Sequence, residues 1–360
     1  MSKQSLRFGI IGCGRVVQDL HLPAWALVPD VQLAAVCDAN PAVLQTLTGR
    51  YPGVRSYSDV GAFLGDSTDL DFVVLATPGI THPTLGEQIL QHDLHLLCEK
   101  PLALDSAGAQ KLYAVAAAAN KVLMPIHNYR YRDNVQAALH WAATGALGDI
   151  TNVQVRFRSG SLFDEPSRWM HNERQHRILL FDFAYHFIDI ALLFLGPLAE
   201  LRFVDAEVDT VGLQYVVFGT RHQNGARGLF ELMFDASAQG TWIDVLGETA
   251  SLQLEFFPDG FRKISGRDQP LKQGIAQAQR LSHFVQHTAR HKFLHTPSHR
   301  ILPHARLFQQ FVTHVRQFGT GSTASQIAIP RVEALALVQL LTDVANDAYA
   351  KECIKGKSAA

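Results

Sequence analysis

The feature that most constrains the fold is a glycine-rich turn that directly follows a short apolar run near residue 10. The run Phe8–Ile11 leads into Gly12, Cys13 and Gly14, and a helical pattern follows. In such a strand–turn–helix unit, Gly12 permits the tight turn, Gly14 lets the backbone approach a pyrophosphate, and the helix N-terminus favours anions. We therefore expect a dinucleotide at this turn. The expected contacts are Gly9, Gly12, Gly14, Arg15 and Val16.

An acidic residue follows the second apolar run at the spacing that a dinucleotide site requires. Leu33–Cys37 ends in Asp38, 24 residues after Gly14, where a carboxylate can accept hydrogen bonds from a ribose. No arginine stands beside Asp38 to bind a 2′-phosphate, so we expect NAD in preference to NADP. Val17 occupies the third position of the glycine pattern and weakens the match. A glycine turn and a surface Asp that bind no nucleotide therefore remain an alternative.

The first 125 residues alternate apolar runs with stretches of helical length, which predicts a doubly wound α/β domain. Helices are expected after Thr81 and after Asp105, two residues that are typical N-caps. The expected strands are Phe8–Ile11, Leu33–Cys37, Phe72–Ala76, His95–Cys98 and Val122–Ile126.

From residue 126 the pattern changes to strands that follow one another without helices, which predicts a largely antiparallel sheet in an α+β domain. The chain has 360 residues, enough for two domains. We place them at 1–125 and 126–360. The expected helices are Asn134–Thr144 and Pro330–Ala350, and the strands are Ile150–Arg158, Leu201–Ala206, Leu213–Phe218, Arg227–Phe234, Trp242–Gly247 and Ser251–Phe256.

Composition excludes several classes of protein. A formal net charge of −1 argues against a dedicated nucleic-acid binder. No apolar run reaches the length of a membrane span, and the first residues lack a signal-peptide pattern, so we expect a cytoplasmic protein without a membrane partner. The four cysteines share no CxxC spacing, which fits a reducing compartment without a disulfide framework or zinc knuckle.

Three further motifs carry a resemblance to a known family. They are Glu99-Lys100-Pro101, the loop from Thr77 to Pro83, and the run from Asp182 to Asp189. Together with the glycine turn, they resemble the glucose-fructose oxidoreductase / inositol dehydrogenase / MocA (Gfo/Idh/MocA) family. The resemblance implies an N-terminal Rossmann domain and a C-terminal open-faced sheet. It also implies a sugar or polyol substrate and a homodimer or homotetramer formed through that sheet.

The resemblance also implies roles for individual residues. Lys100 matches the family's active-site lysine, and Asp182 and His186 match its Asp and His pair. Asp182 and His186 are four apart and would share a helix face, where a carboxylate can orient an imidazole for proton transfer. An ordinary polar helix stripe and a metal site remain alternatives for this pair, although we expect no metal. Further cofactor contacts would be Thr77, Pro78, His82, Glu99 and Lys100, and further substrate contacts His127, Asn128, Arg130, Arg168, Trp169 and Arg177.

The reaction implied is hydride transfer between nicotinamide and a hydroxyl-bearing carbon of a sugar, polyol or sugar derivative. Arg177 and Ile178 replace the family's usual Gly-Gly pair, and Ala184 replaces a common glycine. Arg177 therefore suggests an anionic or phosphate-containing substrate, or a narrower pocket. Two alternatives remain: a dinucleotide-binding sensor or regulatory protein without catalysis, and a hydrolase or lyase that uses bound NAD transiently.

The segment 262–306 is strongly basic, with nine basic residues against one acidic. It also contains histidines at every fourth position, which would form a stripe on a helix. The stripe is compatible with a solvated or subunit-facing surface, a polyanion surface, or metal binding through His pairs. The histidines are His283, His287, His291, His295 and His299.

Overall fold

The structure is a computed structural model that describes residues 5–160, 179–208, 213–234, 236–256, 259–265, 300–318 and 331–358. The chain divides into two compact units, which are described separately. The first unit comprises Met1–Asn128 and His299–Val338, and the second comprises Tyr129–Ser298 and Gln339–Ala360. The first division lies three residues from the boundary that we predicted at 125. The return of a C-terminal segment to the first unit was not predicted.

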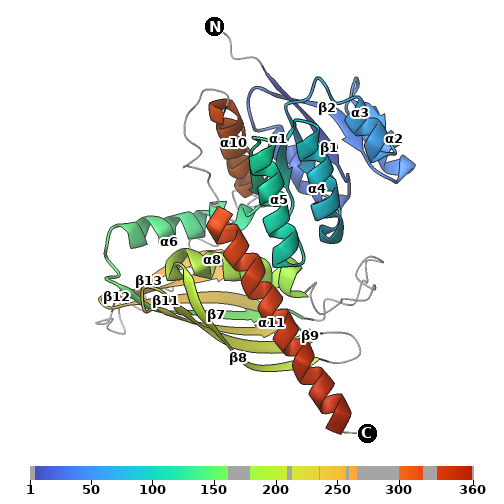
Figure 1. Cartoon of the computed structure of the whole chain (residues 1–360). Coiled ribbons are helices and arrows are strands. Elements are labelled where there is room, and N and C mark those ends of the chain that lie inside the picture. Colours follow the sequence, from blue (N-terminus) through green and yellow to red (C-terminus); the bar gives the residue numbers. More distant parts are fainter. Residues whose placement is uncertain are drawn as a thin grey trace. The chain divides into compact units, whose positions relative to one another are not determined.

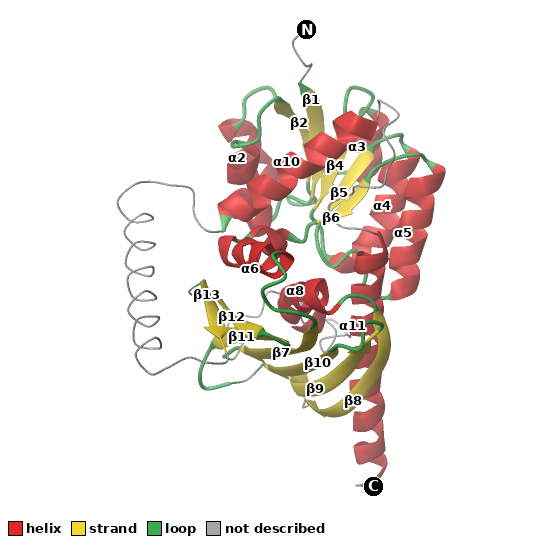
Figure 2. Cartoon of the chain, turned by 90° about the vertical axis from the view of Figure 1, so that its left-hand side faces the viewer, coloured by secondary structure: helices red, strands yellow, loops and turns green. Residues whose placement is uncertain are grey.

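A six-stranded parallel sheet forms the centre of the first unit, in the order β3-β2-β1-β4-β5-β6 (Figure 2). This is the strand order of a dinucleotide-binding fold, in which the order reverses between β1 and β4. Five of the strands were predicted. The sixth, β3, has three residues and no apolar run that would have indicated it. The strands are β1 Leu6–Ile11, β2 Val31–Cys37, β3 Arg55–Tyr57, β4 Phe72–Leu75, β5 His95–Cys98 and β6 Leu123–Pro125.

Helices cover both faces of this sheet: α2 and α10 lie on one side and α4 and α5 on the other (Figure 2). Asp105 caps α5 as predicted, because its carboxylate accepts a hydrogen bond from the Gly108 N–H at 2.8 Å. Thr81 makes no such cap and donates its hydroxyl to the Pro78 carbonyl at 2.7 Å. The helical segments are η1 Val17–His21, α1 Leu22–Trp25, α2 Pro41–Arg50, α3 Val60–Gly65, η2 Gly79–Thr81, α4 His82–Gln91, α5 Ser106–Ala118 and α10 Ile301–Phe318.

Helix α10 packs on the sheet through a cluster of aromatic rings. Phe308 of α10 stacks on Trp25 with ring centroids 4.3 Å apart, and Phe311 meets Phe72 edge-on at 5.1 Å. Phe8 of β1 stacks on Phe72 at 5.2 Å. Buried aromatic pairs of this kind contribute packing beyond the area that they bury. This cluster explains why a segment from the C-terminal part of the chain belongs to the first unit.

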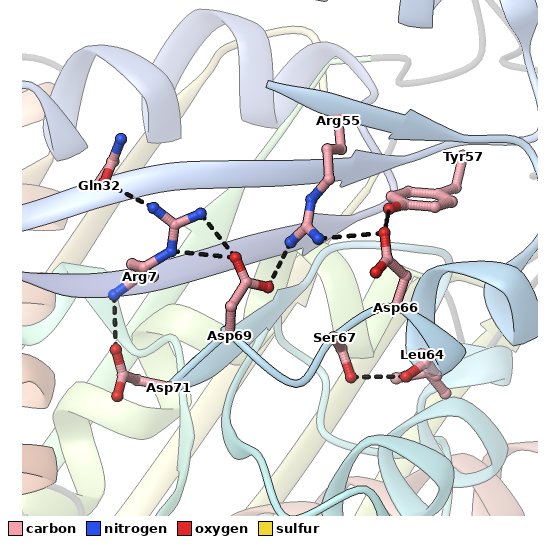
Figure 3. A network of polar contacts seen from close by, with 9 residues as sticks. All are labelled: Arg7, Gln32, Arg55, Tyr57, Leu64, Asp66, Ser67, Asp69 and Asp71. Carbon is pink, nitrogen blue, oxygen red and sulfur yellow. Dashed lines mark hydrogen bonds and ion pairs between the residues drawn. The ribbon is translucent and has the colours of Figure 1, made fainter. Parts of the chain in front are cut away.

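A polar network joins β1, β3 and the loop before β4 (Figure 3). The Asp69 carboxylate accepts hydrogen bonds from the Nη2 atoms of Arg7, at 2.7 Å, and Arg55, at 2.5 Å. Arg55 also donates to Asp66, which accepts the Tyr57 hydroxyl. Although partial burial opposes it, hydrogen bonds from the two arginines lower the pKa of Asp69. Because these groups are partly exposed, each ion pair adds little stability, and the network chiefly fixes the strand ends.

The second unit is built on a seven-stranded sheet in the order β13-β12-β11-β7-β10-β9-β8 (Figure 1). Its neighbouring strands are antiparallel except for β7 and β10, which are parallel, so the predicted largely antiparallel sheet is confirmed. Strand β13 was not predicted. The strands are β7 Ile150–Arg158, β8 Leu198–Val208, β9 Leu213–His222, β10 Arg227–Met233, β11 Gly240–Gly247, β12 Ala250–Phe256 and β13 Gly260–Ser265.

One face of this sheet is buried and the other is partly exposed. Along β10, for example, Phe230 and Leu232 are fully buried. Leu229, which directly precedes Phe230, is 42 % exposed. Helix α8 packs on β7, β10 and β11. The helical segments are η3 Asn128–Tyr131, α6 Asp133–Ala143, η5 Leu179–Ala184, α8 Tyr185–Leu195 and α11 Arg331–Ser358, of which the first and last continue from the first unit. Among the described helices, none has the length and apolarity that a membrane span requires.

Candidate functional site

The glycine turn after β1 is shaped by a close approach between two backbone segments. Gly12 has φ +85°, and a Cβ at this position would lie 2.7 Å from the backbone of Ala76 and Thr77. No side chain can therefore replace its hydrogen without moving the loop after β4. At Gly14 a Cβ would meet nothing within 4 Å, and this residue is exposed. The turn thus leaves open space next to the start of the first helix.

The Asp38 carboxylate lies at the end of β2 and is held in place by backbone donors. Its Oδ2 accepts a hydrogen bond from the Cys13 N–H at 2.7 Å, and its Oδ1 accepts one from the Asn40 N–H at 2.8 Å. Each carboxylate oxygen has further lone pairs that can accept ribose hydroxyls. The structure therefore brings Asp38 and the glycine turn together, as the spacing predicted.

The remaining residues around the turn differ in their surroundings. Gly9 lies inside the sheet, where a Cβ would collide with the Phe63 ring, so this glycine lets α3 pack closely. Arg15 is exposed and pairs with Asp19 at 3.3 Å, and Val16 is half-buried. Val17, the departure from the glycine pattern, is fully buried at the start of the π-helical turn η1. The predicted cofactor contacts of Gly9, Arg15 and Val16 stay predictions.

The loop after β4 is tied to the loop after β5 by a buried histidine. His82 places Nδ1 2.7 Å from the Pro101 carbonyl oxygen and Nε2 2.8 Å from the Thr77 carbonyl oxygen. Burial lowers the pKa of His82, whereas these two carbonyls and Glu99 act in the opposite direction. Thr77 is half-buried and Pro78 is exposed. His82 therefore positions the loop that carries Thr77 and Pro78, and its own contact with the cofactor stays a prediction.

Lys100 lies just beyond the carboxyl end of β5, in a loop whose Lys100–Pro101 peptide bond is cis. Its side chain is half-buried. The preceding Glu99 is 8 % exposed, and it accepts hydrogen bonds at both carboxylate oxygens, from His21 and from the Lys100 N–H. His127 and Asn128, which follow β6, are also buried. The structure therefore groups Lys100 and Glu99 in one loop of the first unit, beyond the carboxyl edge of its sheet.

In the second unit, His186 stacks on an aromatic residue that the sequence did not single out for a role. The rings of His186 and Tyr129 are nearly parallel, at 11°, with centroids 4.0 Å apart. The guanidinium of Arg132 lies over the Tyr129 ring at 4.7 Å and pairs with Asp259. His186 is thus packed against a ring that a cation approaches.

Asp182 and His186 lie on one continuous helical segment, as predicted, but its first part is the π-helical turn η5. Asp182 belongs to η5 and His186 to α8. Because a π-helical turn is wider than an α-helical one, the angle about the helix axis between Asp182 and His186 differs from that in a regular α-helix. Both side chains are half-buried.

Arg130 makes a buried ion pair within the second unit. Its Nε and Nη2 atoms donate to Asp189 at 2.8 and 2.5 Å, which gives a bidentate pair. The two side chains are 8 % and 2 % exposed. The pair holds η3 to α8, and the predicted contact of Arg130 with substrate stays a prediction.

Several predicted residues lie outside the described part of the chain. These are Arg168, Trp169 and Arg177 of the predicted substrate site, Ile178 beside them, and the histidines of the basic segment from His283 to His299.

Comparison with known proteins identifies the family. A sequence model described as "Oxidoreductase family, NAD-binding Rossmann fold" matches residues 6–127. A second, described as "GFO/IDH/MocA C-terminal domain", matches residues 135–253. The chain belongs to the Gfo/Idh/MocA oxidoreductase family. The resemblance read from the Glu-Lys-Pro and Asp-to-His motifs is therefore confirmed.

Individual relatives of this Gfo/Idh/MocA chain are dehydrogenases. It is 29 % identical to a D-apiose dehydrogenase from Rhizobium rhizogenes over 263 residues, covering 71 % of this chain and 74 % of that enzyme. It is 30 % identical to an inositol 2-dehydrogenase from Rhizobium meliloti over 158 residues, covering 44 % and 46 % of the two chains. The structure of the WlbA dehydrogenase from Bordetella pertussis matches with a TM-score of 0.75 at 21 % identity, covering 98 % and 97 %. This last likeness shows a shared fold.

The residues of the first unit fit an NAD molecule. The open space at Gly14 accommodates phosphate next to the start of a helix, and Asp38 presents a fixed carboxylate at the neighbouring strand end. Asp38 and Asn40 are followed by Pro41 and α2, and no basic side chain occurs between Asp38 and Pro41. These features agree with the NAD-binding fold that the family match describes.

Proposed function

We propose that this protein is an NAD-dependent dehydrogenase that acts on a hydroxyl-bearing carbon of a sugar, polyol or sugar derivative. The observation that carries the proposal is the cradle formed by Gly12, Gly14 and Asp38, in a chain whose relatives bear the names D-apiose, inositol and D-glucoside dehydrogenase. The cradle is intact, although Val17 departs from the glycine pattern. This intact cradle and the dehydrogenase relatives support an enzyme over a sensor without catalysis.

NAD, when bound, supplies the hydride acceptor for oxidation of a carbinol. The first unit would hold its pyrophosphate at the Gly12–Gly14 turn and its adenosine ribose at Asp38. Thr77 and Pro78 belong to a loop whose position is fixed by His82. These residues would bind and orient the cofactor. Removal of the proton from the substrate hydroxyl requires a proton acceptor in addition.

Lys100, His186 and Asp182 are the proposed catalytic residues. The ammonium of Lys100 would stabilise negative charge on the reacting oxygen, as a cation does best when it is partly removed from water. His186 would accept the hydroxyl proton during oxidation and return it during reduction. Asp182 would orient the imidazole. Lys100 belongs to the first unit and the other two to the second.

The finer features of substrate and assembly are also proposals. We propose an anionic substrate group as the partner of Arg177, on the chemistry of its guanidinium. We propose a homodimer or homotetramer formed through the partly exposed face of the second sheet, where Leu229 lies. A cytoplasmic location agrees with three buried free cysteines, Cys13, Cys37 and Cys98.

The experiment that tests this function is a screen of sugars, polyols, sugar acids and sugar nucleotides for NADH formation by the purified protein. We expect at least one compound to be oxidised with net release of NADH. Stabilisation by NAD without turnover of any compound would instead indicate a sensor. Retention of reduced cofactor without net NADH would indicate a hydrolase or lyase that uses NAD transiently.

A further inference from the structure

Glu99 is a buried carboxylate whose two oxygens accept hydrogen bonds from different segments of the first unit. Oε1 lies 2.8 Å from Nε2 of His21, at the end of the first helical turn after the glycine loop. Oε2 accepts the backbone N–H of Lys100 at 2.9 Å. A carboxylate oxygen only accepts, so Nε2 of His21 carries the proton. Glu99 thus connects the first helix of the dinucleotide fold to the backbone of Lys100.

The surroundings keep Glu99 ionised. Although burial opposes ionisation, the hydrogen bond from His21 and the nearby charge of Lys100 lower the pKa of Glu99 to about 2. His304 of α10 lies beside His21, with ring centroids 5.4 Å apart, and donates Nδ1–H to the Arg300 carbonyl at 2.7 Å. Burial lowers the pKa of His304 to about 4, so this ring is neutral at pH 7.

Glu99, His21 and His304 also form a set with the composition of a zinc site, since their ligand atoms lie within 4.8 Å of one another. The hydrogen bond of His21 argues against a metal on its Nε2 atom. A metal on Nε2 would force the proton onto Nδ1, and this buried atom has no hydrogen-bond partner in the described part of the chain. Metal-binding histidines almost always donate the other N–H. With the proton on Nε2, Nδ1 is an unprotonated acceptor and His21 serves Glu99.

A second buried contact holds the loop on the other side of Lys100. The Pro101 carbonyl oxygen lies 2.7 Å from Nδ1 of His82. Nε2 of the same ring lies 2.8 Å from the Thr77 carbonyl oxygen. The backbone on both sides of Lys100 is therefore tied to buried side chains, while the Lys100 side chain itself is half-buried. The two contacts leave the lysine loop little freedom to move.

We propose that Glu99 is a positioning residue for Lys100, and that His21, as its hydrogen-bond donor, couples the glycine-turn helix to the lysine loop. This proposal rests on the proposed function only for the role of Lys100 in catalysis. Glu99 acts through the Lys100 backbone, with both oxygens directed into the protein. The predicted direct contact of Glu99 with the cofactor stays an untested alternative to this role.

The test compares Glu99→Ala and Glu99→Gln with Glu87→Gln, a matched control that removes the surface carboxylate paired with Lys111 at 2.6 Å. Amide hydrogen exchange at Lys100 is read by mass spectrometry of a peptide that covers residues 99–103. We expect faster exchange in Glu99→Ala, partial protection in Glu99→Gln because its amide oxygen still accepts, and no change in the control. Unchanged exchange in Glu99→Ala would overturn the proposal, whatever the enzyme's activity.

Kinetics with NAD and the substrate found in the screen supply the second readout. We expect Glu99→Ala to lower kcat about 10²-fold, the effect of a small misplacement of a catalytic group, with the Kd of NAD changed less than about threefold. Glu99→Gln should recover part of the loss, and His21→Phe should lower kcat in the same direction. A loss confined to NAD affinity would overturn the proposal in favour of direct cofactor contact.

Metal analysis of the unaltered protein completes the test. We expect no stoichiometric zinc. One equivalent of zinc that disappears in His304→Gln would overturn the hydrogen-bonded arrangement in favour of a metal site. If Lys100→Ala keeps full turnover while exchange at residue 100 still depends on Glu99, the catalytic role of Lys100 fails and the positioning of its backbone stands.

Discussion

Tyr129 packs against His186, a proposed catalytic residue that lies far from it in the sequence. Its ring stacks on His186 and receives the Arg132 guanidinium. The stack restricts rotation of the His186 ring. We therefore assign Tyr129 to the positioning of His186, provided that His186 acts as the base.

Substitution of Tyr129 separates stacking from hydrogen bonding. We expect Tyr129→Leu to lower kcat about fivefold, because a stacked aromatic pair contributes about 1 kcal/mol and that energy orients the imidazole. Tyr129→Phe keeps the ring and should stay within about twofold of the unaltered enzyme. Steady-state kinetics of the two variants provide the check. Equal losses in both variants would assign the effect to the hydroxyl.

The sequence predicted those site residues whose partners are local or set by the strand order. Gly12, Gly14 and Asp38 belong to one strand–helix–strand unit, so their spacing alone brought them together. Glu99 was expected at the cofactor, but its partner His21 lies 78 positions away and its neighbour His304 more than 200. Pairing at such distances depends on tertiary packing, which no local pattern encodes.

At the scale of elements, the buried pair Arg130–Asp189 joins η3 to α8, the helix that carries His186. Both side chains are almost completely buried, and the contact is bidentate. A buried charge without its partner is costly. The position of α8 against η3 therefore depends on both residues together.

Removal of one member of this pair should destabilise the second unit. We expect Asp189→Ala to lower the free energy of unfolding by about 3–5 kcal/mol, since the Arg130 charge would stay buried and lose its bidentate contact with the Asp189 carboxylate. Arg202→Ala is the control, because this arginine makes an exposed pair with Glu200. Urea unfolding followed by circular dichroism measures both. An effect of Asp189→Ala no larger than that of Arg202→Ala would contradict the structural role of the pair.

Helix α10 makes the stability of the first unit depend on pH through His304. Burial lowers the pKa of this histidine from 6.5 to about 4. The folded state therefore resists protonation that the unfolded chain accepts. This contribution to stability is complete above pH 6.5 and is lost as the pH falls toward 4.

From these values, the loss through His304 between pH 7 and pH 5 should be about 2 kcal/mol. We expect His304→Gln to reduce the difference in unfolding free energy between the two pH values by about that amount. His92→Gln, on the surface at the end of α4, serves as the control. Urea unfolding at pH 5 and pH 7 gives the comparison. Equal pH dependence in His304→Gln and the unaltered protein would show that His304 is not held neutral.

Apolar spacing predicted most elements, and those it missed have identifiable reasons. β3 has three residues, and β13 alternates around the charged pair Arg262 and Lys263. Helix α10 did carry a helical signal, in Leu307, Phe311 and Val315 at every fourth position. Helix α10 was not predicted from this row, which directly follows the basic segment 262–306.

At the scale of the whole molecule, the chain forms two units, each of which is built from two separate segments of the sequence. The first unit takes the N-terminal 128 residues and a returning segment that contains α10. The sequence indicated one change of pattern, near residue 126. It carried no signal that a C-terminal segment belongs to the first unit, because that depends on which surface α10 covers. Each unit carries part of the proposed machinery: Lys100 and the NAD cradle in the first, and His186 with Asp182 in the second.

We propose that the chain oxidises a sugar or polyol hydroxyl with Lys100 as an essential catalytic group. The most direct measurement is the rate of NADH formation by Lys100→Ala on the substrate found in the screen, with the Kd of NAD measured on the same preparation. Lys111→Ala, which removes a surface lysine paired with Glu87, is the control. We expect kcat to fall about 10²-fold or more while the Kd of NAD changes less than about threefold. A kcat equal to that of Lys111→Ala would contradict the proposal.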